Sequence, residues 1–420
     1  MAVGNSNTHA QHVSVPVVAE LPETEASRSV LLEPYHVDLI SEYGYVSREY
    51  MISGIAAGES YCTRLLLRCP ADENDFSGFV VEEPSHLWGG TSIWRHINRW
   101  LMRNGHAWLE VDSQAPSALG KIKAVDPERY KEMHFIPGPL SDEFADNIPF
   151  VTNVTKESLR DAYDSFKAKW WPATLQSPEI LCAASHALRS GRLGLKADKV
   201  ILSGLSQTGE SHVGVKIIEL LGESEFQSVR LPCGVSGQMY ETSHRRPDSE
   251  GFRLYEVAGM AHRESRYASA IDTERLYVAD LRGAKWSSFA NSFIYHAVFQ
   301  AMEKWVRGLA VPPASRMLTT VGDTDEIIRD SHGNALAGVR TLHTDAPLSR
   351  LVAATPKGRP NWYCGSEWPF SNKQLLEVYG SVSNYRRVAG ETLRRQIQDG
   401  FLLLADAETL RRETVETVTF

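Results

Sequence analysis

The residues best suited to chemistry lie at the end of one short apolar strand. Residues 199–209 read Lys-Val-Ile-Leu-Ser-Gly-Leu-Ser-Gln-Thr-Gly, so Ser206 follows the strand and has small residues two positions before and after it. A serine in such a tight turn, a nucleophile elbow, has its hydroxyl lifted clear of the sheet. The usual string is Gly-x-Ser-x-Gly; here Thr208 takes the place of the second glycine and Gly209 follows it. Ser206 is our candidate nucleophile.

Two other interpretations of this string compete with the nucleophile. Gly204 and Gly209 have the spacing of a phosphate-binding loop, but Glu210-Ser211 stands where that motif needs a lysine followed by Ser or Thr. A carboxylate there repels phosphate, which excludes this interpretation. The second is a plain strand-to-loop turn in which the serine only caps backbone groups. The motif alone does not decide between this turn and a nucleophile.

A histidine that follows a later strand favours the nucleophile. Residues 256–262 read Glu-Val-Ala-Gly-Met-Ala-His, and Gly259 frees the backbone to turn before His262. A serine hydroxyl is a poor nucleophile until a base takes its proton, and an imidazole titrates near the required pH. Three other histidines have less suitable settings, in a charged loop, at a strand start and within a helix: His244, His106 and His296.

The composition limits the classes of protein that need to be considered. The chain has 420 residues, 42% hydrophobic and 23% charged, as in ordinary globular proteins. The net charge is -8 and no Lys/Arg-rich run occurs, which argues against nucleic-acid binding. No stretch approaches the roughly 18 apolar residues of a membrane span, and no secretory signal is recognisable. The five cysteines are scattered without the spacing of a metal site or a disulfide framework. We therefore expect a soluble, cytoplasmic protein that does not bind membranes.

The hydrophobic periodicity predicts alternating strands and helices. Residues 61–70 alternate with period two, with Arg64 and Arg68 on one face, which predicts a half-buried antiparallel strand near an edge. The later elements alternate in type, which indicates a parallel sheet with crossover helices. We predict strands over 78–83, 106–112, 198–203 and 252–257, and helices over 91–104, 178–193, 284–307 and from 371 onward.

These elements predict three regions of the chain. Residues 1–30 lack any sustained period and read as a flexible leader. Residues 40–310 form the predicted core, in which the loop-like segment 114–175 is an insert and a candidate lid. Residues 311–420 are predicted to be mainly helical and to pack on the core.

Several longer strings resemble one known family. The chain is similar to the α/β hydrolase domain-containing family, an esterase-like branch of the α/β-hydrolase superfamily, over roughly residues 40–410. The resemblance implies an α/β fold with a mostly parallel central sheet flanked by helices, N-terminal antiparallel strands and a helical C-terminal region. It implies neither a metal nor an organic cofactor. The matching strings are GYVSREYMISGIA (44–56), TRLLLRCPAD (63–72), FVVEEPSHLWGG (79–90), DPERY (126–130), ILSGLSQTG (201–209), LLGESE (220–225), RRPDSEGFRLYEVAGMAH (245–262) and NALAGVRT (334–341).

The resemblance also implies a serine-hydrolase triad. Ser206 attacks an acyl carbonyl, and His262 serves as base and then as acid. The acid of the family follows a strand in a Gly-x-x-acid turn, which here is residues 222–225. We favour Glu225, with Glu223 as second choice. Serine, acid and histidine then follow one another in the chain order of the α/β-hydrolase fold.

The implied oxyanion hole comes from two backbone N–H groups. One belongs to Gln207, the residue after the nucleophile, and the other comes from the loop after Glu83. Ser85 or His86 is our candidate for the second donor. Trp88 in the same loop either lines the acyl pocket or is covered by the C-terminal helices.

The chain departs from the family directly after the elbow. Only 19 positions separate Ser206 from Glu225, too few for the two helices and the strand that the fold needs there. We infer that several tens of residues are missing, through a truncated gene model, a splice form or a real deletion. If residues 215–221 are the acid-bearing strand, the elbow has lost its helix. If residues 213–221 instead form that helix, the acid comes from elsewhere, with Glu241 and Asp248 as candidates.

The leading hypothesis is therefore a serine hydrolase that cleaves a carboxylic ester of a small organic molecule. One alternative is a catalytically impaired or dead relative, and another is an acyltransferase or lyase that uses the same triad. The sequence identifies neither the ester nor the oligomeric state.

Overall fold

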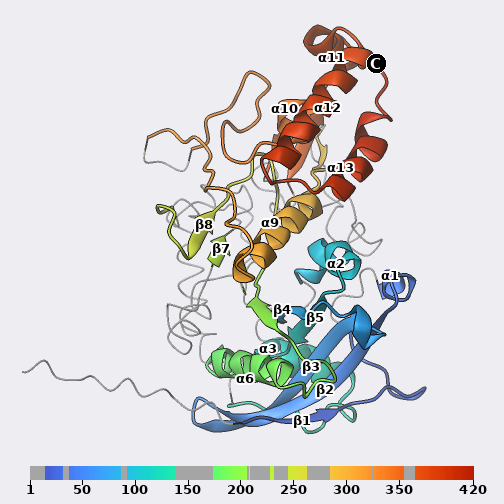
Figure 1. Cartoon of the computed structure of the whole chain (residues 1–420), viewed down its shortest axis with the longest axis vertical. Helices are drawn as coiled ribbons and strands as arrows, with labels where there is room; N and C mark the ends of the chain where they lie inside the picture. The colour runs from blue at the N-terminus through green and yellow to red at the C-terminus, as the bar shows by residue number, and fades with distance from the viewer. Residues whose placement is uncertain are drawn as a thin grey trace, which may run out of the picture. The chain divides into compact units, whose positions relative to one another are not determined.

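The structure, a computed structural model, divides the chain into two compact units. One unit comprises Met1–Ile148 and Asp164–Phe226, and the other comprises Pro149–Tyr163 and Gln227–Phe420 (Figure 1). Whether residues 40–310 form one core stays a prediction. The residues that the structure describes are 15–31, 37–86, 92–137, 174–205, 208, 228–230, 245–262, 284–322, 326–353 and 365–420.

The first unit is built on a six-stranded sheet with the order β1-β2-β3-β5-β4-β6. The strands from β1 to β5 in this order pair antiparallel, whereas β4 pairs in parallel with both β5 and β6. The predicted combination of N-terminal antiparallel strands with a parallel sheet is confirmed. The strands are β1 (Val17–Glu20), β2 (Tyr45–Ala56), β3 (Glu59–Pro70), β4 (Phe79–Pro84), β5 (Ala107–Val111) and β6 (Lys199–Leu202).

Helices cover both faces of this sheet, as crossover connections between parallel strands require. Helix α6 (Ser177–Arg189) packs on the apolar face that carries Leu65 and Leu67. Helix α2 (Trp94–Arg103) connects β4 to β5 on the opposite face, where the Trp94 ring lies 5.2 Å from that of Trp108. The other helical segments among the described residues of this unit are short: α1 (Val37–Glu42), η1 (Glu73–Asp75), α3 (Ala115–Ser117) and η2 (Ala118–Lys123).

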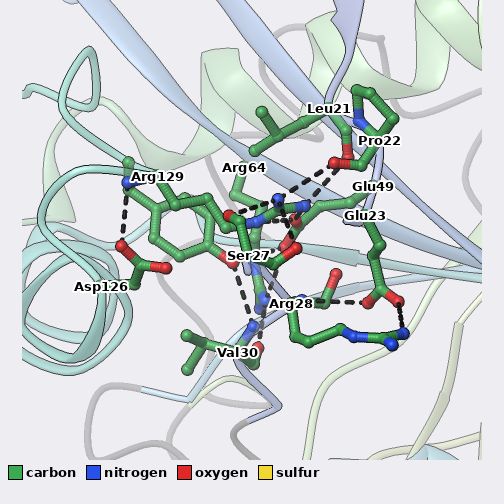
Figure 2. Close-up of polar contacts among 12 residues, drawn as sticks. Leu21, Pro22, Glu23, Ser27, Arg28, Val30, Glu49, Arg64, Asp126 and Arg129 are labelled. Carbon is green, nitrogen blue, oxygen red and sulfur yellow. Dashed lines mark hydrogen bonds and ion pairs between the residues drawn. The ribbon is translucent and has the colours of Figure 1, made fainter. Parts of the chain in front are cut away.

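Strand β3 differs from its sequence-based prediction. It lies in the middle of the sheet between β2 and β5, and Arg64 and Arg68 are almost fully buried. Arg64 binds three carboxylates from neighbouring strands and the residue after β5. Glu49 Oε1 lies at 3.2 Å (Figure 2). Glu110 Oε1 lies at 2.8 Å, and Asp112 contacts the guanidinium Nε. Arg64 therefore belongs to a buried ionic layer, and Arg68 lies over the rings of Trp94 and Trp108, at 4.5 Å and 5.0 Å from the ring centroids. Neither arginine marks a solvent face.

The same ionic layer fastens the N-terminal segment to the sheet. Arg129 donates from Nε to Glu49 at 2.9 Å, and its other nitrogens donate to the carbonyls of Leu21, Pro22 and Ser27 (Figure 2). Strand β1 then pairs with β2 as the edge of the sheet. An ordered strand thus lies inside the segment predicted to be a flexible leader; residues 1–14 lie outside the described part of the chain.

The second unit combines short strands with a helical layer. Strands β7 (Ser228–Arg230) and β8 (Phe252–Leu254) pair in parallel, and a three-stranded antiparallel sheet has the order β10-β11-β9. Buried side chains of α9 to α13, among them Phe293, Tyr379 and Tyr385, form one core. The elements are β9 (Lys285–Trp286), β10 (Ser349–Val352), β11 (Ser366–Pro369), α9 (Asn291–Val306), α10 (Leu342–Asp345), α11 (Asn372–Tyr379), α12 (Val382–Gln398), α13 (Leu404–Leu410) and η8 (Arg411–Val415).

Three predicted boundaries differ in the structure. The helix predicted over 284–307 begins only at Asn291, because residues 285–286 pair with β11. The C-terminal region contains β10, β11 and several isolated bridges before α11, α12 and α13. In the predicted loop 114–175, residues 115–123 are helical, and residues 138–173 lie outside the described part.

Candidate active site

The candidate site lies at one edge of the first unit's sheet, where two parallel strands end side by side. Glu82 on β4 pairs with Leu202 on β6, and the Ser203 N–H donates to the Glu82 carbonyl at 2.8 Å. The chain leaves β4 through Ser85 and His86, and it leaves β6 toward Ser206. Ligand sites of parallel sheets lie beyond the carboxyl ends of the strands. The structure therefore brings Ser85 and His86, two of the candidate oxyanion residues, to the same end of the sheet as the start of the nucleophile elbow.

The described ends of the elbow are held together by Thr208. Its hydroxyl accepts from the Leu205 N–H and donates to the Leu205 carbonyl, both at 2.9 Å. The Thr208 N–H donates to the same carbonyl at 3.3 Å. Thr208, which replaces the usual glycine, is thus hydrogen-bonded to the residue three positions earlier, Leu205. The two residues between them, Ser206 and Gln207, lie outside the described residues.

Ser85 lies in a buried network of polar groups. Its N–H donates to the Val111 carbonyl at 2.9 Å, and its carbonyl accepts from Gln114 Nε2 at 2.7 Å. Its hydroxyl lies 2.9 Å from that of Ser117. The Ser85 N–H is therefore engaged by β5, which argues against Ser85 as the donor of this loop.

Glu83 fastens both ends of the loop that follows β4. Its buried carboxylate accepts from the Ile93 N–H at 2.6 Å, the Ser92 hydroxyl at 3.0 Å and Trp108 Nε1 at 3.0 Å. Burial raises the pKa of Glu83 to about 8, although its hydrogen bonds act in the opposite direction. This carboxyl holds the start of α2 against the end of β4.

Glu82 points to the opposite face of β4, toward α6. Burial raises its pKa to about 8, although a hydrogen bond from the Ser185 hydroxyl lowers it. Its Oε1 has no hydrogen-bond partner among the described residues. Two carboxyls that resist ionisation therefore stand on neighbouring positions of β4.

These raised pKa values predict a pH-dependent stability. Between about pH 4.5 and pH 8 the folded protein keeps protons on Glu82 and Glu83 that the unfolded chain has released. The free energy of unfolding should therefore fall as the pH rises through this window. Glu82→Gln should remove up to about 1.4 kcal/mol of this fall per pH unit. Urea unfolding of both proteins between pH 5 and pH 8 measures the two slopes.

A matched control uses a glutamate on the surface. Glu377 on α11 has a side chain 62% exposed, so Glu377→Gln should leave the slope unchanged. Identical slopes for the wild type and Glu82→Gln would contradict the burial argument.

His262 belongs to the second unit, eight positions after β8. The carbonyl of the preceding residue, Ala261, accepts from Asn291 Nδ2 at 2.7 Å at the start of α9. Gly259 has φ +81°, and a Cβ there would meet the Leu351 side chain at 3.1 Å. Only glycine therefore suits this turn, which confirms the role predicted for it. His262 itself is half-buried.

Of the carboxylates proposed as the acid of the triad, the structure describes only Asp248. Glu225, Glu223 and Glu241 lie outside the described residues. Both oxygens of Asp248 are engaged by Ser315, through its N–H at 3.0 Å and through its hydroxyl. These two bonds lower the pKa of Asp248 despite the opposing effect of burial. Asp248 is thus committed to a structural contact, which weakens the case for it as the triad acid.

Comparison with known proteins decides the family. The sequence profile of a family described as an alpha/beta hydrolase domain matches residues 13–214 and 210–412, almost the whole chain. The chain belongs to this alpha/beta hydrolase family. The predicted α/β-hydrolase fold is thereby confirmed, and the two matched segments meet at residues 210–214, just after the elbow. No curated protein matches the chain significantly.

Several solved structures are similar to this alpha/beta hydrolase at low identity. One is described as a candidate acetyl xylan esterase of Bacteroides fragilis (15% identity, 57% of this chain and 54% of that chain, TM-score 0.27). Another is an esterase of the fungus Rhizomucor miehei (13%, 47% and 48%, TM-score 0.24). A third is described as a candidate dienelactone hydrolase of Klebsiella pneumoniae (11%, 51% and 72%, TM-score 0.25). The chain spans about half the length of the first two, and likeness at this level supports no inference about substrate.

Within the described part of this alpha/beta hydrolase, neither a membrane helix nor a metal site is found. None of the helices there combines enough length and apolar character to cross a bilayer. Over the same residues, no group of three or more His, Cys, Asp or Glu side chains is placed to hold a metal ion.

Sequence reasoning missed the buried residues that support the site. Glu83 and Gln114 bind both sides of the loop after β4, and Asn291 holds the residue before His262. The two glutamates inside the apolar string GFVVEE were the available signal, because charged residues seldom lie in a buried strand without partners. The sequence around Gln114 and Asn291 contained no comparable signal.

Proposed function

We propose that this protein is a serine hydrolase that cleaves carboxylic esters of small organic molecules. Ser206 is the nucleophile, His262 the general base, and Glu225 the acid that orients the imidazole, with Glu223 as second choice. The peptide N–H groups of Gln207 and His86 form the oxyanion hole. Membership of the alpha/beta hydrolase family supports this assignment. The main structural support for this proposal is that the parallel strands β4 and β6 end side by side, at the same end of the sheet.

The direction of the peptide groups along β4 supports His86 as an oxyanion donor. Successive residues of an extended strand direct their peptide groups to opposite neighbours. The Glu82 carbonyl faces β6, where it accepts from Ser203, and the Ser85 N–H faces β5, where it donates to Val111. If this alternation continues one position further, the His86 N–H faces the β6 side, toward the segment that leads to Ser206.

The proposed reaction has two stages. The Ser206 oxygen bonds to the ester carbonyl carbon while its proton passes to His262, and the carbonyl oxygen takes up the negative charge between the two N–H donors. Collapse of this intermediate breaks the bond to the alcohol, which leaves with the proton from His262. Water then attacks the acyl-enzyme in the same way and releases the acid and Ser206.

The class of reaction is tested by the products formed from p-nitrophenyl acetate. We expect acetate and p-nitrophenol, with Ser206-dependent turnover. The same assay with added methanol or an amine separates hydrolysis from acyl transfer. Predominant formation of methyl acetate or the amide would replace hydrolysis by transfer, and the absence of turnover in every condition would contradict both.

A second candidate function, a catalytically impaired relative, is supported by the break in the family match. The two matched segments meet at residues 210–214, within the 19 positions between Ser206 and Glu225 where we infer a missing segment. The helix after an elbow contributes its dipole to the site and holds the strained turn. Its loss should loosen the nucleophile.

We therefore predict that a family member with the complete segment turns over p-nitrophenyl esters faster than this chain. Misplacement of a reacting group by about 1 Å can reduce the rate about 100-fold, and we expect a reduction of at least that size. Parallel measurements of kcat under the same conditions provide the comparison. Equal kcat values would show that the elbow does not need the missing residues.

A further inference from the structure

The Gln114 side chain lies against the peptide group that we propose as an oxyanion donor. Gln114 follows β5 by three positions, and its Nε2 donates to the Ser85 carbonyl at 2.7 Å. Both residues are at most 2% exposed. The Ser85 carbonyl and the His86 N–H belong to the same peptide unit. A side chain that binds one end of this unit therefore also determines where the other end points.

Because the peptide bond is planar, the hydrogen bond from Gln114 to the Ser85 carbonyl also fixes the direction of the His86 N–H. In a trans peptide the carbonyl oxygen and the N–H point in opposite directions, and no cis peptide occurs in the described part of the chain. Because Gln114 holds the Ser85 oxygen on the β5 side, the His86 N–H is directed away from β5. A hydrogen bond to the carbonyl also polarises the amide, which makes its N–H a better donor.

Neighbouring groups keep Gln114 itself in place. The Gln114 carbonyl accepts from the Ser117 hydroxyl at 3.0 Å, and the Ser117 hydroxyl lies 2.9 Å from that of Ser85. The Ser85 N–H is bound to Val111 on the same side. The Gln114 side chain thus fixes the 85–86 peptide, and the main-chain bond to Val111 fixes the adjoining 84–85 peptide. A preorganised oxyanion donor requires such fixed surroundings.

We infer that Gln114 is a positioning residue of the oxyanion hole. In this role it acts by setting the orientation of the 85–86 peptide and not by binding the substrate. This inference rests on the proposed ester hydrolysis. It predicts that Gln114 contributes to the stabilisation of the negatively charged intermediate more than to the binding of the neutral ester.

Gln114→Glu tests this role with little change in side-chain size. Burial should raise the pKa of a carboxyl at this position, as it does for Glu82 and Glu83, so the first measurement is made at a pH high enough to ionise it. An ionised Glu has no donor for the Ser85 carbonyl, so at that pH kcat for p-nitrophenyl acetate should fall about 10- to 100-fold while KM changes less than about 3-fold. The protonated acid regains a donor. The kcat of the variant relative to that of the wild type should therefore recover as the pH is lowered, which a merely structural defect would not produce. Affinity for a trifluoromethyl ketone, whose adduct carries an oxyanion, should fall in parallel with kcat/KM.

Two further variants complete the experiment. Ser113→Ala removes a neighbouring buried hydroxyl that contacts Ser177 at 2.7 Å, and it should leave kcat unchanged. If Gln114→Glu does not fold, Gln114→Met, which also lacks a donor, should show the loss of kcat without its recovery at low pH. A kcat equal to that of an active wild type in a folded Gln114 variant would overturn the inference and leave the proposed function standing. A wild type without Ser206-dependent turnover would overturn both.

Discussion

Ser206→Ala should abolish the turnover of p-nitrophenyl esters. Removal of the nucleophile from a serine-hydrolase triad costs about 10⁴-fold or more in kcat, because the remaining groups then only bind and polarise the ester. The effect should appear in kcat, with little change in the stability of the fold. Steady-state kinetics on both proteins, with unfolding midpoints measured alongside, provide the test.

The chain offers a matched control three positions earlier. Ser203 lies at the end of β6 and binds the Glu82 carbonyl through its N–H, which Ser203→Ala retains. This control should keep the wild-type kcat. If Ser206→Ala retained more than a tenth of the wild-type kcat, the nucleophile would have to be another residue.

Arg64→Met should destabilise the first unit by about 3–5 kcal/mol. Its guanidinium is fully buried and binds Glu49 on β2, Glu110 on β5 and Asp112, the residue after β5. Figure 2 shows the contact with Glu49. Removal of one partner from a buried ion group leaves charges without compensation, and this costs far more than loss of an exposed pair. The pKa of Arg64 is lowered by burial but raised overall by these carboxylates, which keeps the cation charged in the fold. Urea unfolding followed by tryptophan fluorescence measures the loss.

The charge balance of the cluster makes this effect large. Arg64 and Arg129 supply two positive charges against the three carboxylates, so the variant would leave one cation among them. Arg28→Met is the matched control, because its ion pair with Glu23 is exposed and should contribute less than about 1 kcal/mol. If Arg64→Met were as stable as Arg28→Met, the cluster would not hold the sheet.

The sequence predicted the parallel part of the sheet well and its buried charges poorly. The apolar strings around residues 79–84 and 199–202 have lengths and turn signals that identify strands without tertiary information. The alternation in β3 identified a strand as well. Its position in the sheet was wrong, because Arg64 and Arg68 resemble a solvent face until their partners on other strands are known. Those partners lie 15 to 48 positions away from Arg64 in the chain.

Long-range pairing also explains the other differences. Val17–Glu20 carry no signal of their own and become a strand because β2 offers an edge. Residues 285–286 leave the predicted helix because β11, about 80 positions later, pairs with them.

In the candidate site, the sequence suggested the residues to which we assign the chemistry but not the residues that bind the neighbouring backbone. Ser206 and His262 stand in strings with a recognisable turn chemistry. Glu83 and Gln114 act through contacts with residues that only the fold brings near, at the junction of β4, β5 and α2. The choice between Ser85 and His86 likewise needed the direction of one N–H, which depends on the pairing of β4 with β5.

The most direct test of the account is the site at which a fluorophosphonate probe reacts. We predict that mass spectrometry of the labelled protein finds one phosphonyl group, on the peptide that contains Ser206, and that His262→Ala removes it. This result would show a serine activated by that histidine. A label on another residue, no label at all, or a Ser206 label that persists unchanged in His262→Ala would contradict the account.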